Sequence, residues 1–263
     1  MNKETLFSKI EAYETPSTVF FRSIEIKILK ERFGELFRGK KILDLGCGDG
    51  IAALAVFDEP IDYGLDNESG ALKIAEKSNA YKKTIFADAT KIPLQDESLD
   101  TVFSNCSIEH MENIKDVLQE VFRVLKKGGL FIFTGISDNF KNYGVLSFLK
   151  MGFIAKRYGV FRDKRLKHLN VYSLDGWNQV LKEAGFKAVD GYYYLGKPEI
   201  ELWDFLTIMY YCLHFLGKFG REINLLFYKI LFRKIIYGKF VSSKPTDSKG
   251  AAVCVIVKKE AYI

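Results

Sequence analysis

Short apolar runs alternate with helical patterns through the first half of the chain. Five runs have the length and composition of buried strands: residues 41–45, Ile61–Asp66, Lys83–Asp88, 99–105 and 130–136. Segments between them place apolar residues at helical spacing: GIAALAVF, SGALKIAEKS with Ser69 as N-cap, and IKDVLQEVFRVLKKGG closed by Gly128. Strands that alternate with helices predict an α/β fold with a mostly parallel, doubly wound sheet.

The same patterns predict elements on both sides of this region. Residues 4–37 are predicted to be helical, with a break near Pro16. SLDGWNQVLKEAGF is predicted to form a helix that starts at Ser173 or Asp175 and ends at Gly185. The next stretch, KAVDGYYYLG, and the late stretch GAAVCVIVKKE are both predicted strands.

The stretch KKILDLGCGDG places three glycines directly after the first strand, at the carboxyl edge of the sheet where such folds bind ligands. Its spacing is G-x-G-x-G and position 51 is Ile, so it is not the dinucleotide fingerprint, and no P-loop Lys-Ser/Thr follows. Asp44 and Asp49 flank the turn. Carboxylates are unfavourable beside phosphates, so the turn favours a ligand that carries an ammonium or sulfonium charge.

Acidic residues also end the second and third predicted strands. Asp66 ends the second strand, a position from which a carboxylate accepts hydrogen bonds from both ribose hydroxyls of a nucleoside. Asp88 ends the third strand, and Ala89 follows it with a backbone donor for an adenine edge. Three strand ends therefore supply a glycine turn, a ribose acid and a purine acid.

Four stretches together resemble the class I S-adenosylmethionine-dependent methyltransferases of the small-molecule type 11/25: ILDLGCGDG, YGLDNE, ADATKIPLQDESLDTVFSNCSIEHMEN and EVFRVLKKGGLFIFT. They cover residues 40–136, and HLNVYSLDGWNQVLKEAGF extends the similarity to residue 190. The resemblance implies a Rossmann-like seven-stranded sheet of order 3-2-1-4-5-7-6, with the last strand antiparallel and with helical cap insertions. It also implies S-adenosylmethionine as the cofactor.

The resemblance assigns roles to individual residues. Asp66 is expected to meet the ribose, Asp88 the adenine amine, and Asn105 or Cys106 the methionine part through backbone groups. Arg22, in VFFRS, is expected to meet the methionine carboxylate. The predicted cofactor site as a whole comprises Asp44, Gly46, Cys47, Gly48, Gly50, Asp66, Asn67, Asp88, Ala89, Asn105, Cys106 and Arg22.

The chain has three histidines, and two are candidates for the acceptor side of the site. His110, in SIEHMEN, follows the fourth strand and is interpreted either as a general base or as a structural hydrogen bonder. His168 is a candidate for substrate contact, whereas His214 is interpreted as structural. Cys47 and Cys106 are interpreted as small packing residues rather than nucleophiles. Methyl transfer from a sulfonium is driven mainly by proximity and alignment, so few catalytic groups are needed.

Positive charge is concentrated in two segments, although the formal net charge of the chain is only +6. Residues 139–168 hold eight basic residues and one acid, and residues 218–244 hold seven basic residues and one acid. Both segments place bulky apolar residues at helical spacing beside Lys and Arg, a pattern typical of helices that lie on a membrane surface. A lid over the site or a homodimer interface is the alternative, and the sequence leaves both open. Nucleic acid is not expected, because the basic residues are mixed with aliphatic ones.

The predicted layout is an N-terminal helical cap, residues 1–38, and a methyltransferase domain, residues 39–263. Insertions at 139–168 and 199–245 are predicted to form a substrate lid or a membrane-facing subdomain. No metal site is predicted, because the cysteines and histidines have no metal-ligand spacing.

The expected location is cytoplasmic or membrane-peripheral. The N-terminus lacks an apolar signal segment, and the richest apolar stretch, Leu202–Gly217, contains Asp204 and is shorter than the roughly 20 residues of a membrane span. The predicted function is methyl transfer to a small or lipid-linked acceptor, with O-methylation favoured. The alternative is a non-catalytic binding or scaffold protein that keeps the fold.

Overall fold

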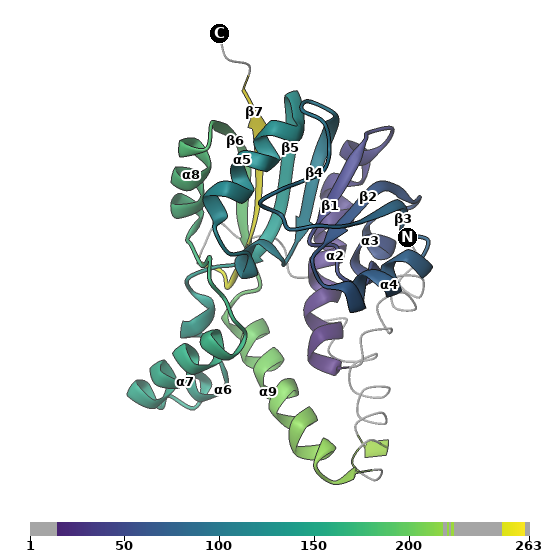
Figure 1. Ribbon diagram of the computed structural model, residues 1–263. Helices are drawn as coiled ribbons and strands as arrows, with labels where there is room; N and C mark the ends of the chain where they lie inside the picture. Colours follow the sequence, from purple (N-terminus) through teal and green to yellow (C-terminus); the bar gives the residue numbers. More distant parts are fainter. Residues whose placement is uncertain (1–14, 218–219, 221, 224–248, 261–263) are drawn as a thin grey trace.

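The computed structural model describes residues 15–217, 220, 222–223 and 249–260, and within them the chain forms a seven-stranded sheet (Figure 1). Its order is β3-β2-β1-β4-β5-β7-β6. The strands are β1 Ile42–Leu45, β2 Ile61–Asp66, β3 Tyr81–Phe86, β4 Leu99–Asn105, β5 Leu125–Ile136, β6 Phe186–Tyr194 and β7 Ala252–Lys259. Strands β1 to β5 are all parallel to one another, and β7 is antiparallel to both β5 and β6. The predicted order and the antiparallel last strand are confirmed.

Helices cover both faces of the sheet. One face packs against α2 (Pro16–Phe37) and α3 (Ile51–Val56), and the other packs against α5 (Ile114–Val124) and α8 (Leu174–Glu183). Successive residues of a strand point to opposite faces. Ile132 of β5 accordingly joins the cluster of α2, whereas its neighbours Phe131 and Phe133 join the cluster of α5 and α8. Burial on both faces explains why the central strands, such as β1 and β4, are nearly continuous apolar runs.

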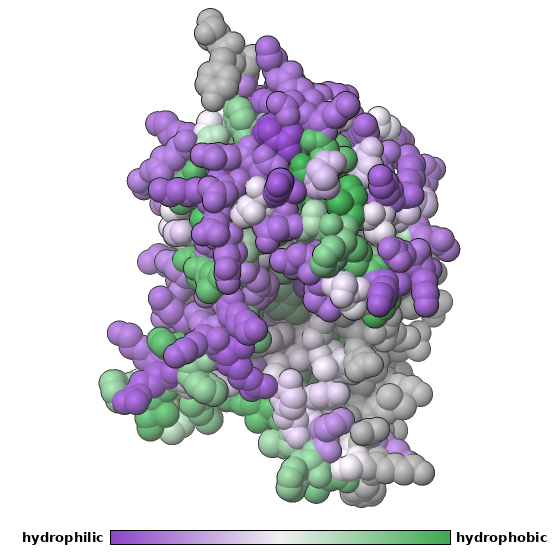
Figure 2. Space-filling view, viewed as in Figure 1, coloured by the Kyte–Doolittle hydropathy of each residue, from purple (hydrophilic) through white to green (hydrophobic). Residues whose placement is uncertain are grey.

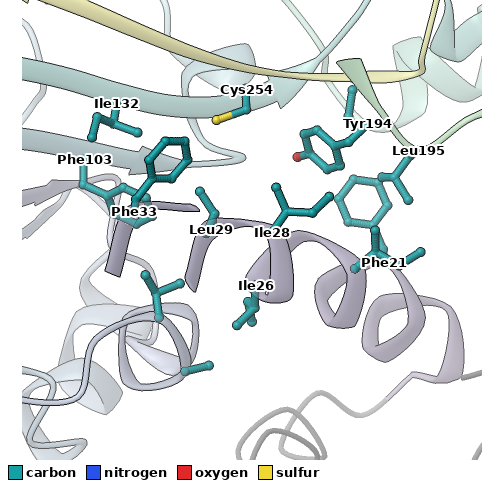
Figure 3. Close-up of a cluster of buried hydrophobic side chains, with 14 of the residues drawn as sticks. Phe21, Ile26, Ile28, Leu29, Phe33, Phe103, Ile132, Tyr194, Leu195 and Cys254 are labelled. Atoms are coloured by element: carbon teal, nitrogen blue, oxygen red, sulfur yellow. The ribbon is translucent and has the colours of Figure 1, made fainter. Parts of the chain in front are cut away.

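Helix α2 belongs to the core of the fold. Its N-cap is Thr15, whose side chain accepts a hydrogen bond from the Thr18 amide, and Pro16 occupies the first turn. In Figure 3 Phe33 of α2 lies against Phe103 and Ile132 of the sheet. The predicted cap boundary at residue 38 therefore runs through one continuous core, and the division into cap and domain stays a prediction. Residues 4–14 of the predicted helix lie outside the described residues.

Several element boundaries differ from the prediction. The third strand, β3, runs over Tyr81–Phe86 instead of Lys83–Asp88, so Asp88 lies two residues beyond its end. Ser69 is not the N-cap of α4 (Ser69–Lys77): Glu68 precedes the helix, and its carboxylate accepts hydrogen bonds from the Gly70 and Ala71 amides. Gly128 does not end α5, which stops at Val124 so that β5 can begin pairing with β4 at Leu125 and Leu99. Long-range pairing thus shortens a helix that local propensity would continue.

Additional helices extend beyond the carboxyl edge of the sheet (Figure 1). After β5 come the short turn η2 (Phe140–Asn142), α6 (Val145–Phe148) and α7 (Gly152–Arg165), and after β6 comes α9 (Lys197–His214). They occupy the predicted insertions, whose bounds stay predictions. Most of the predicted amphipathic stretch 223–234 lies outside the described residues.

A buried polar contact fixes α7 to the rest of this helical group. The Arg162 guanidinium donates to the carbonyls of Phe140 and Tyr143 and pairs with Asp204 of α9 at 3.2 Å. At Gly159 a Cβ would lie 1.7 Å from the Lys141 carbonyl oxygen, so only glycine allows α7 to approach η2 this closely.

Among the described residues no helix is long and apolar enough to cross a membrane.

Candidate active site

The turn after β1 lies at the carboxyl edge of the sheet, and its Gly46, Cys47, Gly48 and Gly50 amides donate hydrogen bonds within the protein. Gly46, Gly48 and Gly50 have φ angles of +76°, +53° and +82°, which favour glycine. A Cβ on Gly46 would lie 1.8 Å from Ser107 Oγ, so a side chain there would collide with the segment after β4. The Gly46 amide donates to the Leu65 carbonyl of β2 at 2.8 Å. Backbone conformation and close approach therefore both require glycine at the start of this turn.

Asp66 joins the end of β2 to the glycine turn. Its Oδ2 accepts a hydrogen bond from the Gly48 amide at 2.8 Å, and its Oδ1 accepts one from the Glu68 amide at 2.8 Å. Two backbone donors hold the carboxylate in one orientation, and each oxygen keeps a second lone pair for a ligand. Asp66 is thereby preorganised to accept hydrogen bonds from a pair of hydroxyl groups.

Asp88 is held in a similar way after β3. Its Oδ1 accepts hydrogen bonds from the Thr90 amide at 2.8 Å and from the Thr90 hydroxyl at 2.6 Å. These bonds from Thr90, together with one from the Asn67 side chain, lower the pKa of Asp88 despite a small opposing effect of burial. Asp88 is therefore ionised at neutral pH, and its contact with Asn67 links the ends of β2 and β3.

A cavity of about 390 Å³ opens between these strand ends and the segment after β4. Six predicted site residues line it: Gly46, Asp66, Asn67, Asp88, Ala89 and His110. Its lining also includes residues that the sequence interpretation missed: Leu65, Ala87, Thr90, Ser107, Met111, Glu112, Asn113 and Val117. The predicted residues outside this lining are Asp44, Cys47, Gly48, Gly50, Asn105, Cys106, Arg22 and His168. The volume and the few convergent polar groups are those of a small-molecule site.

Sequence comparison relates this arrangement to known proteins. Residues 43–133 match a family model described as a methyltransferase domain. Phosphoethanolamine N-methyltransferase 2 of Caenorhabditis elegans is 33% identical over 153 residues, which are 51% of this chain and 35% of that protein. The chain thus spans about a third of that relative's length. The uncharacterized protein MJ1252 of Methanocaldococcus jannaschii is 30% identical over 181 residues, 65% of this chain and 69% of that protein.

The fold has a close counterpart among solved structures. A SAM-dependent methyltransferase from Thermotoga maritima aligns with a TM-score of 0.59 and 18% identity over 92% of this chain and 93% of that one. At this identity the likeness shows the fold. The chain belongs to the class I S-adenosylmethionine-dependent methyltransferases. Membership in this family makes S-adenosylmethionine the methyl donor.

The surroundings of Asp44 bear on whether this site fits a methyl donor with a cationic amino-acid end. Its carboxylate is 2% exposed, and Oδ2 accepts a hydrogen bond from the Tyr81 hydroxyl at 2.7 Å. Oδ1 has no hydrogen-bond partner among the described residues. Burial raises the pKa of Asp44 to about 7 against the effect of Tyr81, and nearby Asp66 raises it further. A buried carboxylate with one unpaired oxygen favours a cationic partner, although Asp44 itself is not among the residues that line the cavity.

The two candidate thiols near the turn are protonated. Burial raises the pKa of the Cys47 thiol, and the charges of Asp44 and Asp66 raise it further. Burial likewise raises the pKa of Cys106, with added effects of Glu25 and Glu109. A protonated, buried thiol is a poor nucleophile, which agrees with the interpretation of both cysteines as packing residues.

A buried polar cluster around Glu25 lies behind the end of β4, and the sequence interpretation missed it. Glu25 accepts hydrogen bonds from the Cys106 thiol at 2.9 Å, from the Tyr194 hydroxyl and from Arg22. Burial opposes its ionisation, but Arg22, Cys106 and Tyr194 outweigh this and lower the pKa of Glu25. The guanidinium of Arg22 is thus paired with Glu25, and its predicted contact with a methionine carboxylate stays a prediction.

Glu109 is a second buried acid that the sequence interpretation missed. It is 1% exposed, and its Oε2 has no hydrogen-bond partner among the described residues. Burial raises the pKa of Glu109 to about 7, although its backbone hydrogen bond, His168 and Arg22 act in the opposite direction. Its backbone carbonyl accepts hydrogen bonds from the Leu169 and Asn170 amides. Its position beside His110 in SIEHMEN was the available signal.

The two predicted histidines lie next to each other, with ring centroids 5.3 Å apart. His110 lines the cavity, and its Nδ1 lies 3.1 Å from the Lys167 carbonyl oxygen. Since a carbonyl only accepts, Nδ1 of His110 donates this hydrogen bond, and in the neutral tautomer that fits it the lone pair is on Nε2. His168 instead has a buried side chain that contacts Asp163 at 3.1 Å and packs on Phe140. The catalytic and substrate roles of both histidines stay predictions.

The substitution Asp44→Asn is expected to reduce the pH dependence of stability. The pKa of Asp44 is about 7 when folded and 3.8 as the reference value, so the unfolded chain loses this proton first. The resulting stability is complete below about pH 4 and is lost as the pH rises through about 7. Glu109 acts in the same direction, so the decline should shrink in Asp44→Asn but not vanish.

Urea unfolding of the cofactor-free protein measures this at mildly acid and mildly alkaline pH. The matched control is Asp175→Asn, an exposed acid in the first turn of α8, which should keep the wild-type decline. An equal decline in wild type and Asp44→Asn would contradict the claim that Asp44 causes part of the loss of stability with rising pH.

Proposed function

We propose that this chain transfers the methyl group of S-adenosylmethionine to a small or lipid-linked acceptor, with oxygen as the methylated atom. The observation that carries the proposal is the cavity at the carboxyl edge, in which Asp66 is fixed against the glycine turn by the Gly48 amide. A dinucleotide would need the other glycine spacing and would place phosphates beside Asp44. An adenosyl sulfonium has no phosphate and carries positive charge.

In this proposal the chain holds the donor along three strand ends. Asp66 accepts hydrogen bonds from the ribose hydroxyls, with Asn67 beside it, while Asp88 and the Ala89 amide face the adenine. The methionine part lies toward Asp44 and the turn amides. The orientation of the Asp66 and Asp88 carboxylates by backbone donors supports these roles, because a preorganised acceptor loses little freedom on binding. Further predicted contacts to the methionine part are Gly46, Cys47, Gly48, Gly50, Asn105, Cys106 and Arg22.

His110 is proposed to act on the acceptor. The bound sulfonium supplies an activated methyl group, so the protein must mainly align the acceptor with it. A hydroxyl acceptor must also lose its proton, and the free Nε2 of His110 at the cavity wall is a suitable base. This supports oxygen as the methylated atom. With a lipid-linked acceptor the enzyme would work at a membrane surface.

The substitution Asp66→Asn is expected to weaken binding of S-adenosylmethionine and S-adenosylhomocysteine by roughly tenfold or more, the effect of losing hydrogen bonds to a charged acceptor. Titration calorimetry measures both ligands. Asp175→Asn is again the matched control, and thermal melting establishes that each variant is folded. Wild-type affinity in Asp66→Asn would contradict the ribose role. Donor binding without methyl release on any acceptor would favour the non-catalytic alternative.

The substitution His110→Ala is expected to lower the rate of transfer to hydroxyl acceptors by about 10²-fold or more, the usual contribution of a positioned base. Affinity for S-adenosylmethionine should change much less. The assay follows release of S-adenosylhomocysteine with small and lipid-linked hydroxyl acceptors, and His214→Ala on α9 is the control. A lowered rate with hydroxyl acceptors, alongside unchanged affinity for the donor, would support the base role, whereas an unchanged rate would exclude it.

A further inference from the structure

One surface of the helical group at the carboxyl edge is both apolar and basic. It is formed by α6, α7 and the end of α9, and we call it the basic apolar face. Figure 2 shows apolar residues gathered at this end of the molecule among hydrophilic ones. Its exposed apolar residues are Phe148, Leu149, Met151, Phe153, Ile154, Val160, Phe161, Phe205, Ile208, Tyr211, Phe215 and Leu216. Isolated exposed apolar residues are ordinary, but a contiguous group indicates an interaction site.

The apolar residues of α7 do not hold this helix to the protein. Contact with the rest of the chain is made by Gly159, which packs on the Lys141 carbonyl, and by Arg162, which pairs with Asp204. Phe153 and Phe161, in contrast, are 71% and 61% exposed. Folding therefore fixes the orientation of α7 through small and polar residues and leaves its large apolar side chains to the outside.

Apolar and basic residues share the outward side of α7. Counted from Arg157, the residues Phe153, Val160, Phe161 and Lys164 lie three, four or seven positions away, which places all five on one side of the helix. The Arg157 guanidinium lies 5.6 Å from the centre of the Phe153 ring. Long basic side chains beside apolar ones can bury their stems and keep their charge in a polar layer. This is the pattern of a helix that lies in a bilayer interface.

Neighbouring segments continue the same face. Arg165 of α7 lies 5.1 Å from the ring of Tyr211, so α7 and α9 meet there. Ser147 of α6 hydrogen bonds to Glu201 of α9 at 3.0 Å. Phe215, just after α9, is 93% exposed. The three helices are therefore braced against one another and present their apolar side chains as one rigid unit.

The charges on this face select the partner. Seven basic residues of this region form no ion pair with any other residue in the described part of the chain: Lys141, Lys150, Lys156, Arg157, Lys164, Arg165 and Lys167. The one acid of residues 139–168, Asp163, contacts His168. Two copies of the chain joined through this face would bring two sets of unpaired cations together, which disfavours a dimer. We propose that the basic apolar face docks on an anionic lipid bilayer.

The docked face connects directly to the cavity. The carbonyl of Lys167, two residues after α7, accepts a hydrogen bond from His110 on the cavity wall. The Leu169 and Asn170 amides that follow donate to the Glu109 carbonyl. The segment that follows α7 therefore joins the docked helix to the cavity wall. The idea that docking delivers a lipid-linked acceptor rests on the proposed function, whereas the docking itself does not.

Vesicle flotation of the full chain tests the proposal. Phosphatidylcholine vesicles with and without phosphatidylglycerol are compared for wild type, for Phe153→Ser/Phe161→Ser and for Arg157→Gln/Lys164→Gln. The matched control is Ile74→Ser/Val189→Ser, two exposed apolar residues on α4 and β6. Wild type and control should float with anionic vesicles and bind neutral ones at least about tenfold more weakly. Each double variant on α7 should bind anionic vesicles about tenfold more weakly or worse.

Two further measurements separate the outcomes. Calorimetric affinity for S-adenosylmethionine should be the same in wild type and in all variants. If wild type does not bind S-adenosylmethionine, the proposed function is refuted, and the docking result still stands. Analytical ultracentrifugation reports association between copies. No flotation of wild type, or equal flotation of the α7 variants, overturns the proposal. A dimer that Phe153→Ser/Phe161→Ser converts to monomer, without vesicle binding, would assign the face to contact between copies instead.

Discussion

The carboxylate of Asp66 holds the glycine turn and the end of β2 together, and the geometry of the site depends on this contact. Pairing of Leu45 with Leu65 brings Asp66 level with the turn, where it accepts the Gly48 amide at 2.8 Å. Each glycine of the turn has a positive φ. Without the contact to Asp66, this glycine-rich backbone could adopt many other conformations. One carboxylate therefore both fixes the backbone of the turn and lines the cavity at the carboxyl edge.

Most of the sheet could be predicted from local patterns. The central strands β1, β4 and β7 are buried along most of their length and are short apolar runs, and the helices between strands carry caps or amphipathic spacing. Strand order was available only through resemblance to the family, because pairing between distant strands leaves no local pattern. Gly128 shows the limit: the helix before it ends early since Leu125 pairs with Leu99.

The site divides in the same way between predictable and unpredictable parts. Asp66 and Asp88 are strand-end acids, and the sequence interpretation identified them from their place after an apolar run. The cluster of Glu25, Tyr194 and Cys106 could not be identified, because Glu25 and Tyr194 are separated by 169 positions and meet only through packing of α2 on β6. Glu109 likewise looks like an ordinary solvated acid until the fold buries it.

Helices α6, α7 and α9 form a separate group beside the strand ends (Figure 1). Their anchor is the buried pair of Arg162 and Asp204. A buried ion pair contributes little net stability but strongly disfavours arrangements that leave either charge unpaired. Such an anchor suits a rigid group of helices whose apolar residues must remain outside.

A crystal structure with S-adenosylhomocysteine bound tests the central claim most directly. The account predicts the ribose hydroxyls on the Asp66 carboxylate, the adenine beside Asp88 and Ala89, and the amino-acid end toward Asp44, with the wall at His110 still open to an acceptor. Binding of the ligand elsewhere, or a ribose that makes no contact with Asp66, would contradict it.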